Sequence, residues 1–217
     1  MLNSELSLKY LIKESPIKEN KSPLLILLHG FGSNEEDLFS FSSYLPNKYT
    51  IISLRAPFKL PMQGYAWYSI NFDEEMNKFN NHTQAEESIN LILKFINQIS
   101  SKYNIDNNNV SLLGFSQGTI LSYALALNYP KKFKSIIGFS GYIDNQMINL
   151  KSNELYNNLN FYLSHGTEDP VIPFDWSIKS TKLLDDLKIN YCFKEFKSGH
   201  TISAENFFDF KNWFSRI

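Results

Sequence analysis

The sequence Gly-Phe-Ser-Gln-Gly at 114–118 constrains the fold of this chain more than any other feature. The apolar residues at 110–114 predict a buried strand, and those at 119–127 predict a core-facing helix. A serine on the sharp turn between them needs glycine two residues to either side, where strand and helix approach closely. The chain has 9 glycines, so a plain glycine-rich turn is the alternative. The strand and helix flanks favour Ser116 as a nucleophile.

Chain order then selects a base. In α/β-hydrolases the serine is followed by an aspartate or glutamate and then by a histidine near the C-terminus. Of the 4 histidines in the chain, only His165 and His200 follow Ser116. His200 lies between a predicted strand at 191–196 and the last predicted helix, so we expect it to be the base. His165 lies at a strand end, and we interpret it as a structural histidine bonded to the backbone.

The acid is expected between the serine and the histidine in chain order, after a strand that follows the serine turn. Asp169 follows the predicted strand at 161–164, within the turn-forming sequence Gly-Thr-Glu-Asp-Pro. It is therefore the predicted acid. The alternative is that Asp169 only caps the helix that begins near Pro173. Glu168 and Asp175 are then the nearest substitutes.

A second glycine-rich loop is the candidate oxyanion hole. The apolar run at 24–28 predicts a buried strand, and it leads into His-Gly-Phe-Gly at 29–32. In an α/β-hydrolase one amide donor comes from such a loop and the other from the residue after the nucleophile. We assign the backbone N–H groups of Phe31 and Gln117 to these roles. His29 is expected to brace the loop by hydrogen bonding.

Seven motifs occur in an order that resembles the phospholipase/carboxylesterase family, which includes the acyl-protein thioesterases. They are His-Gly-Phe-Gly at 29–32, Arg-Ala-Pro at 55–57, Trp-Tyr at 67–68, Gly-Phe-Ser-Gln-Gly at 114–118, Ser-Gly at 140–141, His-Gly-Thr-Glu-Asp-Pro-Val-Ile-Pro at 165–173 and Gly-His at 199–200. The resemblance runs from about residue 24 to 213. It implies a Ser116, Asp169 and His200 triad, with the amides of Phe31 and Gln117 as oxyanion donors.

The segment at 57–81 is a long connection with several aromatic residues, and it supplies the candidate substrate contacts. These are Tyr65, Trp67, Tyr68 and Phe72. Connections of this length are uncommon unless they form lids or binding loops. We expect the segment to overhang Ser116 and limit the acyl chain, with Trp67 setting the limit. Ordinary packing of these aromatics is the alternative.

Predicted strands and helices alternate along the whole chain, which favours a single α/β domain over residues 1–217. The predicted strands are 24–28, 51–54, 110–113, 135–139, 161–164 and 191–196. The predicted helices are 34–44, 83–103, 117–128, 174–187 and 204–214. This pattern predicts an α/β-hydrolase fold, with a mostly parallel central sheet and helices on both faces. Residues 6–12 are expected to add antiparallel strands at one edge.

Composition narrows the possible partners. The net charge of −1 and the two arginines, Arg55 and Arg216, argue against nucleic-acid binding. No metal-ligand or phosphate-loop motif is present, so no metal and no cofactor is expected. No apolar run approaches the roughly 20 residues of a membrane span, and the N-terminus lacks the apolar core of a secretory signal. The single cysteine, Cys192, is consistent with a cytoplasmic location.

These observations predict a serine hydrolase that cleaves carboxylic esters with short to medium acyl chains. Its partner is expected to be a small-molecule ester or acyl substrate, and a homodimer is left open. Acyl-protein thioesterase or lysophospholipase activity is the main alternative, because the triad sets the reaction and the pocket sets the substrate. An acyltransferase and a non-catalytic binding protein of the same fold are two further alternatives.

Overall fold

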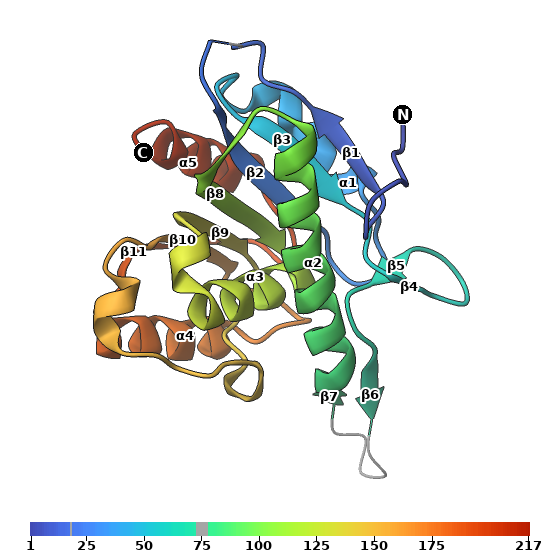
Figure 1. Ribbon diagram of the computed structural model, residues 1–217. Coiled ribbons are helices and arrows are strands. Elements are labelled where there is room, and N and C mark those ends of the chain that lie inside the picture. The colour runs from blue at the N-terminus through green and yellow to red at the C-terminus, as the bar shows by residue number, and fades with distance from the viewer. Residues whose placement is uncertain (18, 73–77) are drawn as a thin grey trace.

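The computed structural model describes residues 1–17, 19–72 and 78–217, and its centre is a seven-stranded sheet (Figure 1). In spatial order the strands are β1 (Tyr10–Lys13), β3 (Thr50–Leu54), β2 (Ser22–Leu28), β8 (Ile105–Phe115), β9 (Ser135–Phe139), β10 (Asn160–Gly166) and β11 (Asn190–Phe196). β1 pairs with β3 in antiparallel register, and all other neighbours are parallel. The predicted mostly parallel sheet is confirmed, and the antiparallel edge expected at 6–12 forms as β1, which begins at Tyr10.

Alternation along the buried strands divides the core into two layers. Leu24, Ile26 and Leu28 of β2 belong to the core cluster on one face, whereas Leu25 and Leu27 belong to the cluster on the other. Successive side chains of a strand point to opposite faces, so an apolar run with both parities requires cover on both sides. The core therefore lies on both faces of the sheet, as predicted.

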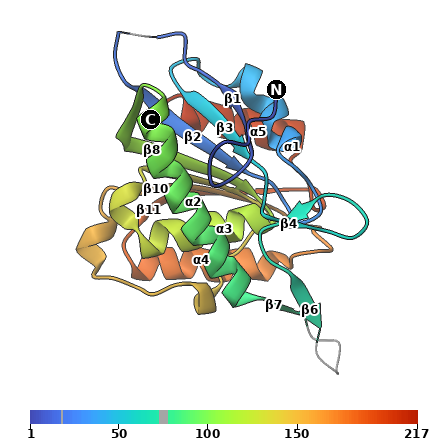
Figure 2. The same ribbon diagram turned by 45° about the vertical axis from the view of Figure 1, so that its right-hand side comes forward.

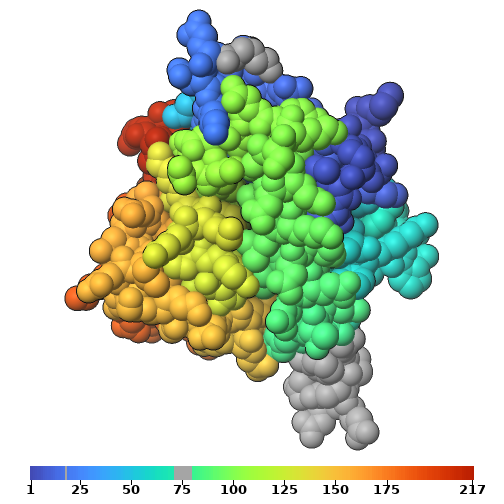
Figure 3. Space-filling model, viewed as in Figure 1, coloured from blue at the N-terminus to red at the C-terminus, as the bar shows by residue number. Residues whose placement is uncertain are grey.

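In the described part of the chain, α-helices cover both faces of this sheet (Figures 1 and 2). The first face carries α2 (His82–Lys102), α3 (Gln117–Asn128) and α4 (Phe174–Asp186), and the second carries α1 (Glu36–Phe39) and α5 (Ala204–Phe214). In the space-filling view α2 crosses the first face as one green band, with the yellow to orange part of the chain beside it (Figure 3).

The helix predicted at 34–44 forms only in part. α1 ends at Phe39 and continues as a 3₁₀ turn, η1 (Ser40–Tyr44). The Ser40 hydroxyl donates to the Asp37 carbonyl at 2.6 Å. Serine side chains that bond to nearby backbone compete with the regular helix, which explains the early end of α1. Three more short 3₁₀ turns follow: η2 (Pro130–Lys132), η3 (Asn145–Met147) and η4 (Asn153–Tyr156).

The long connection between β3 and α2 contains two small antiparallel strand pairs that the sequence did not predict. β4 (Phe58–Lys59) pairs with β5 (Tyr65–Ala66), and β6 (Ile70–Phe72) pairs with β7 (Lys78–Asn80). The side chain of Asn81 then accepts a hydrogen bond from the Gln84 backbone N–H at 3.1 Å and caps α2. Among the described residues, no helix combines the length and apolar character that a membrane crossing requires.

Candidate active site

Ser116 sits on a strained turn between β8 and α3. Its φ of 53° lies in the left-handed region, which a residue with a side chain adopts only when the surroundings enforce it. A Cβ at Gly114 would lie 2.5 Å from the Gly118 backbone, and a Cβ at Gly118 would lie 1.9 Å from the Leu28 carbonyl oxygen. The two glycines therefore let β8, α3 and β2 close around the turn, as the motif predicts.

The structure brings Ser116, His200 and Asp169 together in one hydrogen-bonded chain. His200 Nε2 lies 2.9 Å from Ser116 Oγ, and His200 Nδ1 lies 2.7 Å from Asp169 Oδ2. A carboxylate only accepts hydrogen bonds, so Nδ1–H donates to Asp169 and Nε2 is free to accept from the serine hydroxyl. Loops after β10 and β11 carry Asp169 and His200 to the carboxyl edge of the sheet, where Ser116 lies.

Asp169 is held rigidly by its own loop. Its Oδ1 accepts the backbone N–H groups of Val171 at 2.8 Å and Ile172 at 2.9 Å, and its side chain is fully buried. The two alternative acids, Glu168 and Asp175, are exposed. Asp169 is therefore the acid that the structure places against His200.

His165 lies behind the same carboxylate. Its Nε2 is 2.9 Å from the Ile172 carbonyl oxygen and 3.3 Å from Asp169 Oδ2, and the side chain is fully buried. Burial lowers the pKa of His165 below its ordinary value, so the imidazole is neutral at pH 7. This backbone-bonded position at the end of β10 is the one expected for a structural histidine.

His29 orients the loop that follows β2. The backbone N–H of Ala56 donates to His29 Nε2 at 3.1 Å, so the ring proton is on Nδ1, which donates to the Gly30 carbonyl at 2.8 Å. A trans peptide is planar, with its C=O and N–H pointing in opposite directions. Fixing the Gly30 carbonyl therefore fixes the direction of the Phe31 N–H.

Neither the Phe31 nor the Gln117 backbone N–H has a hydrogen-bond acceptor among the described residues. The Gln117 side chain is fully engaged: its Oε1 accepts from the Trp67 backbone N–H and its Nε2 donates to the Tyr68 carbonyl, both at 2.8 Å. One side chain of the turn thus fixes the segment between β5 and β6, while the backbone amide of the same residue stays open.

A cavity of about 260 Å³ opens beside Ser116. The residues that line it are Phe31, Tyr68, Ile70, Asn80, Ser116, Gln117, Ile120, Tyr142, Val171, Ile172 and His200. Both predicted amide donors and two of the three residues of the hydrogen-bonded chain lie on this cavity.

The four predicted substrate contacts have different positions relative to the cavity. Tyr68 lines the cavity. Trp67 does not: it is fully buried, and its Nε1–H donates to the His29 carbonyl at 2.9 Å. Tyr65 precedes both in the segment and does not line this cavity, and its hydroxyl accepts from Arg55 Nη1 at 3.1 Å. The side chain of Phe72 lies outside the described residues.

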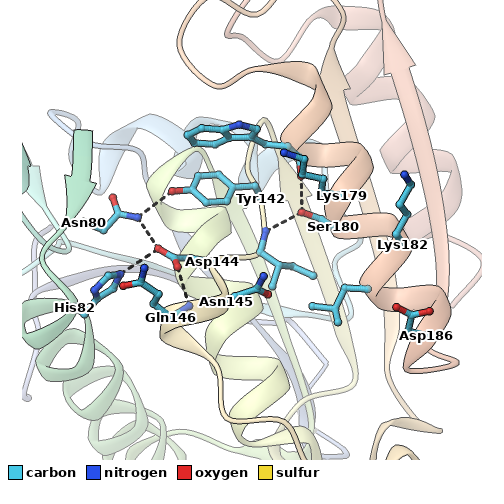
Figure 4. A pocket seen from close by; sticks show the side chains of 13 residues that line it. Asn80, His82, Tyr142, Asp144, Asn145, Gln146, Lys179, Ser180, Lys182 and Asp186 are labelled. Carbon is cyan, nitrogen blue, oxygen red and sulfur yellow. Dashed lines mark hydrogen bonds and ion pairs between the residues drawn. The ribbon is translucent and has the colours of Figure 1, made fainter. Parts of the chain in front are cut away.

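The sequence did not single out two residues of the cavity wall, Asn80 and Tyr142. Tyr142 follows the end of β9, and residues after parallel strands gather at one edge of the sheet, so its position was a usable signal. Asn80 stands in a polar run that resembles a solvated loop. Both residues also line a second cavity of about 630 Å³ (Figure 4). Among the described residues no group of three or more His, Cys, Asp and Glu is placed to hold a metal ion.

The chain is similar to known proteins over most of its length. The family model described as Phospholipase/Carboxylesterase matches residues 12–216. The chain is 26% identical over 204 residues to acyl-protein thioesterase 1 of Schizosaccharomyces pombe, covering 84% of this chain and 85% of that protein.

Solved structures share the fold. A carboxylesterase from Bacillus cereus superimposes with a TM-score of 0.83 at 19% identity, covering 96% of this chain and 94% of that one. Acyl-protein thioesterase 2 of Zea mays gives a TM-score of 0.77 at 20% identity, covering 95% and 97%. The fold and its serine turn define an α/β-hydrolase. Within that class, the chain belongs to the phospholipase/carboxylesterase family of hydrolases.

Proposed function

We propose that this protein is a carboxylesterase in which Ser116, His200 and Asp169 form the catalytic triad. The observation that carries the proposal is the hydrogen-bonded chain of 2.9 Å and 2.7 Å that ends on a cavity. The backbone of Ser116 is strained, and both carboxylate oxygens of Asp169 accept hydrogen bonds. Two backbone amides on the same cavity have no acceptor among the described residues.

Acylation follows from this arrangement. Ser116 Oγ attacks the ester carbonyl while His200 Nε2 takes the hydroxyl proton. The imidazolium that forms is stabilised by Asp169 through the Nδ1–H bond. The carbonyl oxygen becomes an oxyanion and accepts from the N–H groups of Phe31 and Gln117, which lose no other partner on binding it.

Completion of acylation and the deacylation that follows use the same groups. His200 donates its proton to the leaving alcohol, which breaks the ester bond and leaves the acyl group on Ser116. A water molecule then takes the place of the alcohol, and His200 removes a proton from it as it attacks the acyl carbonyl. Collapse of the second tetrahedral intermediate releases the carboxylic acid and restores the serine hydroxyl.

The size of the cavity supports short to medium acyl chains. Its volume of about 260 Å³ is below the range of roughly 300–1,000 Å³ that suits drug-sized ligands. Acyl-protein thioesterase activity is the second candidate, because the matched S. pombe protein carries that name and aligns over 84% of this chain. The same triad would cleave a thioester.

A cytoplasmic location is proposed on a separate observation. Cys192 is the only cysteine, so the fold cannot depend on an intramolecular disulfide and suits a reducing compartment. Cell fractionation with an antibody against the chain tests this proposal.

The test of the catalytic proposal compares two serines that follow neighbouring strands. Ser116 and Ser140 both have positive φ, of 53° and 49°, but only Ser116 contacts His200. Ser116→Ala should abolish fluorophosphonate labelling and lower p-nitrophenyl ester hydrolysis on the order of 10⁴-fold or more. Ser140→Ala should keep both. Ester turnover that survives in a folded Ser116→Ala protein would remove Ser116 from the mechanism.

The same proteins should be assayed on an ester panel from acetate upward, with an acyl thioester and a lysophospholipid beside it. The panel ranks the ester and thioester candidates directly. A thioester rate that exceeds every ester rate would transfer the assignment to the second candidate.

A further inference from the structure

A tyrosine whose buried hydroxyl has no partner among the described residues lines the cavity beside Ser116. The Tyr68 side chain is fully buried, and its Oη has no hydrogen-bond partner among the described residues. A buried polar group left unpaired costs about 1–3 kcal/mol, so such groups are rare outside functional sites. Tyr68 lines the cavity that contains Ser116.

A second tyrosine that lines the same cavity has an unused hydroxyl donor. Tyr142 Oη accepts from Asn80 Nδ2 at 2.9 Å, and Asn80 Nδ2 also donates to Asp144 Oδ2 at 2.8 Å (Figure 4). The carboxylate of Asp144 can only accept, so it holds the NH₂ end of Asn80 toward Tyr142. Tyr142 is thereby used as an acceptor, and its own O–H remains free to donate.

Further contacts make this arrangement rigid. His82 Nε2 lies 3.3 Å from the same Asp144 oxygen. The ring of Trp176 packs edge-on against Tyr142, with their centroids 4.7 Å apart. The wall is therefore preorganised from behind by residues of the larger cavity.

Both phenols stay neutral donors at physiological pH. Burial, and then the nearby Tyr142 and Asp144, raise the pKa of Tyr68 well above 10. Burial is also the main cause that raises the pKa of Tyr142. Since Asp144 places a negative charge behind the wall, these donors favour an uncharged oxygen over a carboxylate.

The position of the donors indicates which part of the substrate they meet. The leaving alcohol must lie beside His200, next to the loop of Val171 and Ile172 that binds Asp169. Tyr68 is fixed instead to the Gln117 side chain, whose residue supplies an oxyanion amide. We therefore expect the acyl group to occupy the part of the cavity on the side of Tyr68, and the alcohol the part on the side of Val171 and Ile172.

We propose that Tyr68 and Tyr142 form a polar subsite that donates hydrogen bonds to an uncharged oxygen carried by the acyl group. The inference rests on the proposed esterase function and names its substrate class: esters of short hydroxy or oxo acids, preferred over alkyl esters of equal length. Asn80 is a positioning residue, because it acts through Tyr142.

Matched esters of one alcohol test the proposal. One pair is ethyl 4-oxopentanoate and ethyl pentanoate, and the other is ethyl 3-hydroxybutanoate and ethyl butanoate. In at least one pair the enzyme's kcat/KM ratio, oxygenated ester to alkyl ester, should exceed the corresponding ratio of alkaline hydrolysis rates about tenfold. Tyr68→Phe and Tyr142→Phe should each lower the favoured ratio about five- to tenfold, since each deletes one donor. Intrinsic ester reactivity cancels between wild type and variant.

Tyr156→Phe is the matched control. Tyr156 is also fully buried, but its hydroxyl donates to the Leu127 carbonyl and the residue does not line the cavity. Its substitution should lower stability and leave the ester ratio unchanged. Two different tyrosines are tested so that a folding defect in one variant leaves the other informative.

Several results would overturn the subsite. Equal ratios in wild type and in both folded tyrosine variants would make the phenols structural. A preference for monoethyl succinate over ethyl 4-oxopentanoate would contradict the uncharged ligand. A further substrate pair, 2-methoxyethyl pentanoate and butyl pentanoate, differs by an oxygen in the alcohol part of the ester. If the tyrosine variants change only the kcat/KM ratio of this pair, the subsite lies on the alcohol side. Normal alkyl-ester hydrolysis in these cases would leave the proposed function intact, whereas no hydrolysis of any ester would remove both.

Discussion

The catalytic chain and the cavity wall differ in how many of their hydrogen bonds are already made. Both oxygens of Asp169 are occupied, both nitrogens of His29 are occupied, and the Gln117 side chain is saturated. On the wall, the Tyr68 hydroxyl has no partner among the described residues and Tyr142 keeps a donor free. Groups that must hold one geometry bond to the protein, whereas groups that select a ligand keep donors for it.

The largest effect is expected from a substitution in the hydrogen-bonded catalytic chain. His200→Ala removes the ring that bridges Ser116 and Asp169, so ester kcat should fall on the order of 10⁴-fold or more. His165→Ala should lower mainly stability, because His165 bonds to the Ile172 backbone and not to Ser116. Steady-state kinetics and thermal unfolding of both variants check this. Reversed effects would reassign the base.

A substitution at Trp67 tests whether this residue is part of the core or of the cavity wall. Trp67→Ala should lower the free energy of unfolding by about 3–5 kcal/mol, because it empties a fully buried site and frees the His29 carbonyl. Trp176→Ala, at a site 37% exposed, should cost less. Urea unfolding provides the measurement.

The same Trp67→Ala protein addresses the acyl-length hypothesis derived from the sequence. If Trp67 limits the acyl chain, the variant should accept longer p-nitrophenyl esters than the wild type does. An unchanged cutoff in folded protein would assign Trp67 to the core alone and leave the limit to residues that line the cavity.

A smaller change sharpens the role of the oxyanion loop. His29→Phe keeps a ring beside Trp67 but removes the bond to the Gly30 carbonyl, so the Phe31 N–H loses its fixed direction. We expect kcat to fall about 10- to 100-fold, less than the loss of a whole oxyanion donor, with little change in KM. Kinetics measured well below the unfolding temperature check this. A selective rise in KM would instead place His29 in ground-state binding.

The smallest effect concerns pH. Burial lowers the folded-state pKa of both His29 and His165, so below about pH 6.5 the unfolded chain binds protons that the folded protein excludes. Stability is therefore retained above pH 6.5 and falls as the pH drops below it, by at most about 1.4 kcal/mol per pH unit for each histidine. Urea unfolding at pH 7.5, 6.0 and 5.0 should show a shallower slope for His165→Ala. An identical slope would mean that His165 does not exclude the proton.

Sequence order alone was enough to predict the sheet, the serine turn and the residues placed against it. The reason is that these features depend on local requirements. Gly114 and Gly118 must be glycines because backbone atoms occupy the space of their Cβ atoms, and parallel strands end at one edge, so Asp169 and His200 arrive beside Ser116. The helix at 34–44 was only partly right, because the Ser40 hydroxyl bonds to the backbone there.

Only the tertiary structure decided the cavity wall. Trp67 and Tyr68 are neighbours with similar side chains, yet one packs behind the oxyanion loop and the other lines the cavity. That choice depends on the Gln117 side chain, about fifty residues away, which bonds to the backbone of both. Local sequence carries no signal of such a contact, because a side chain in a connection takes its direction from whatever distant residues bind the backbone around it.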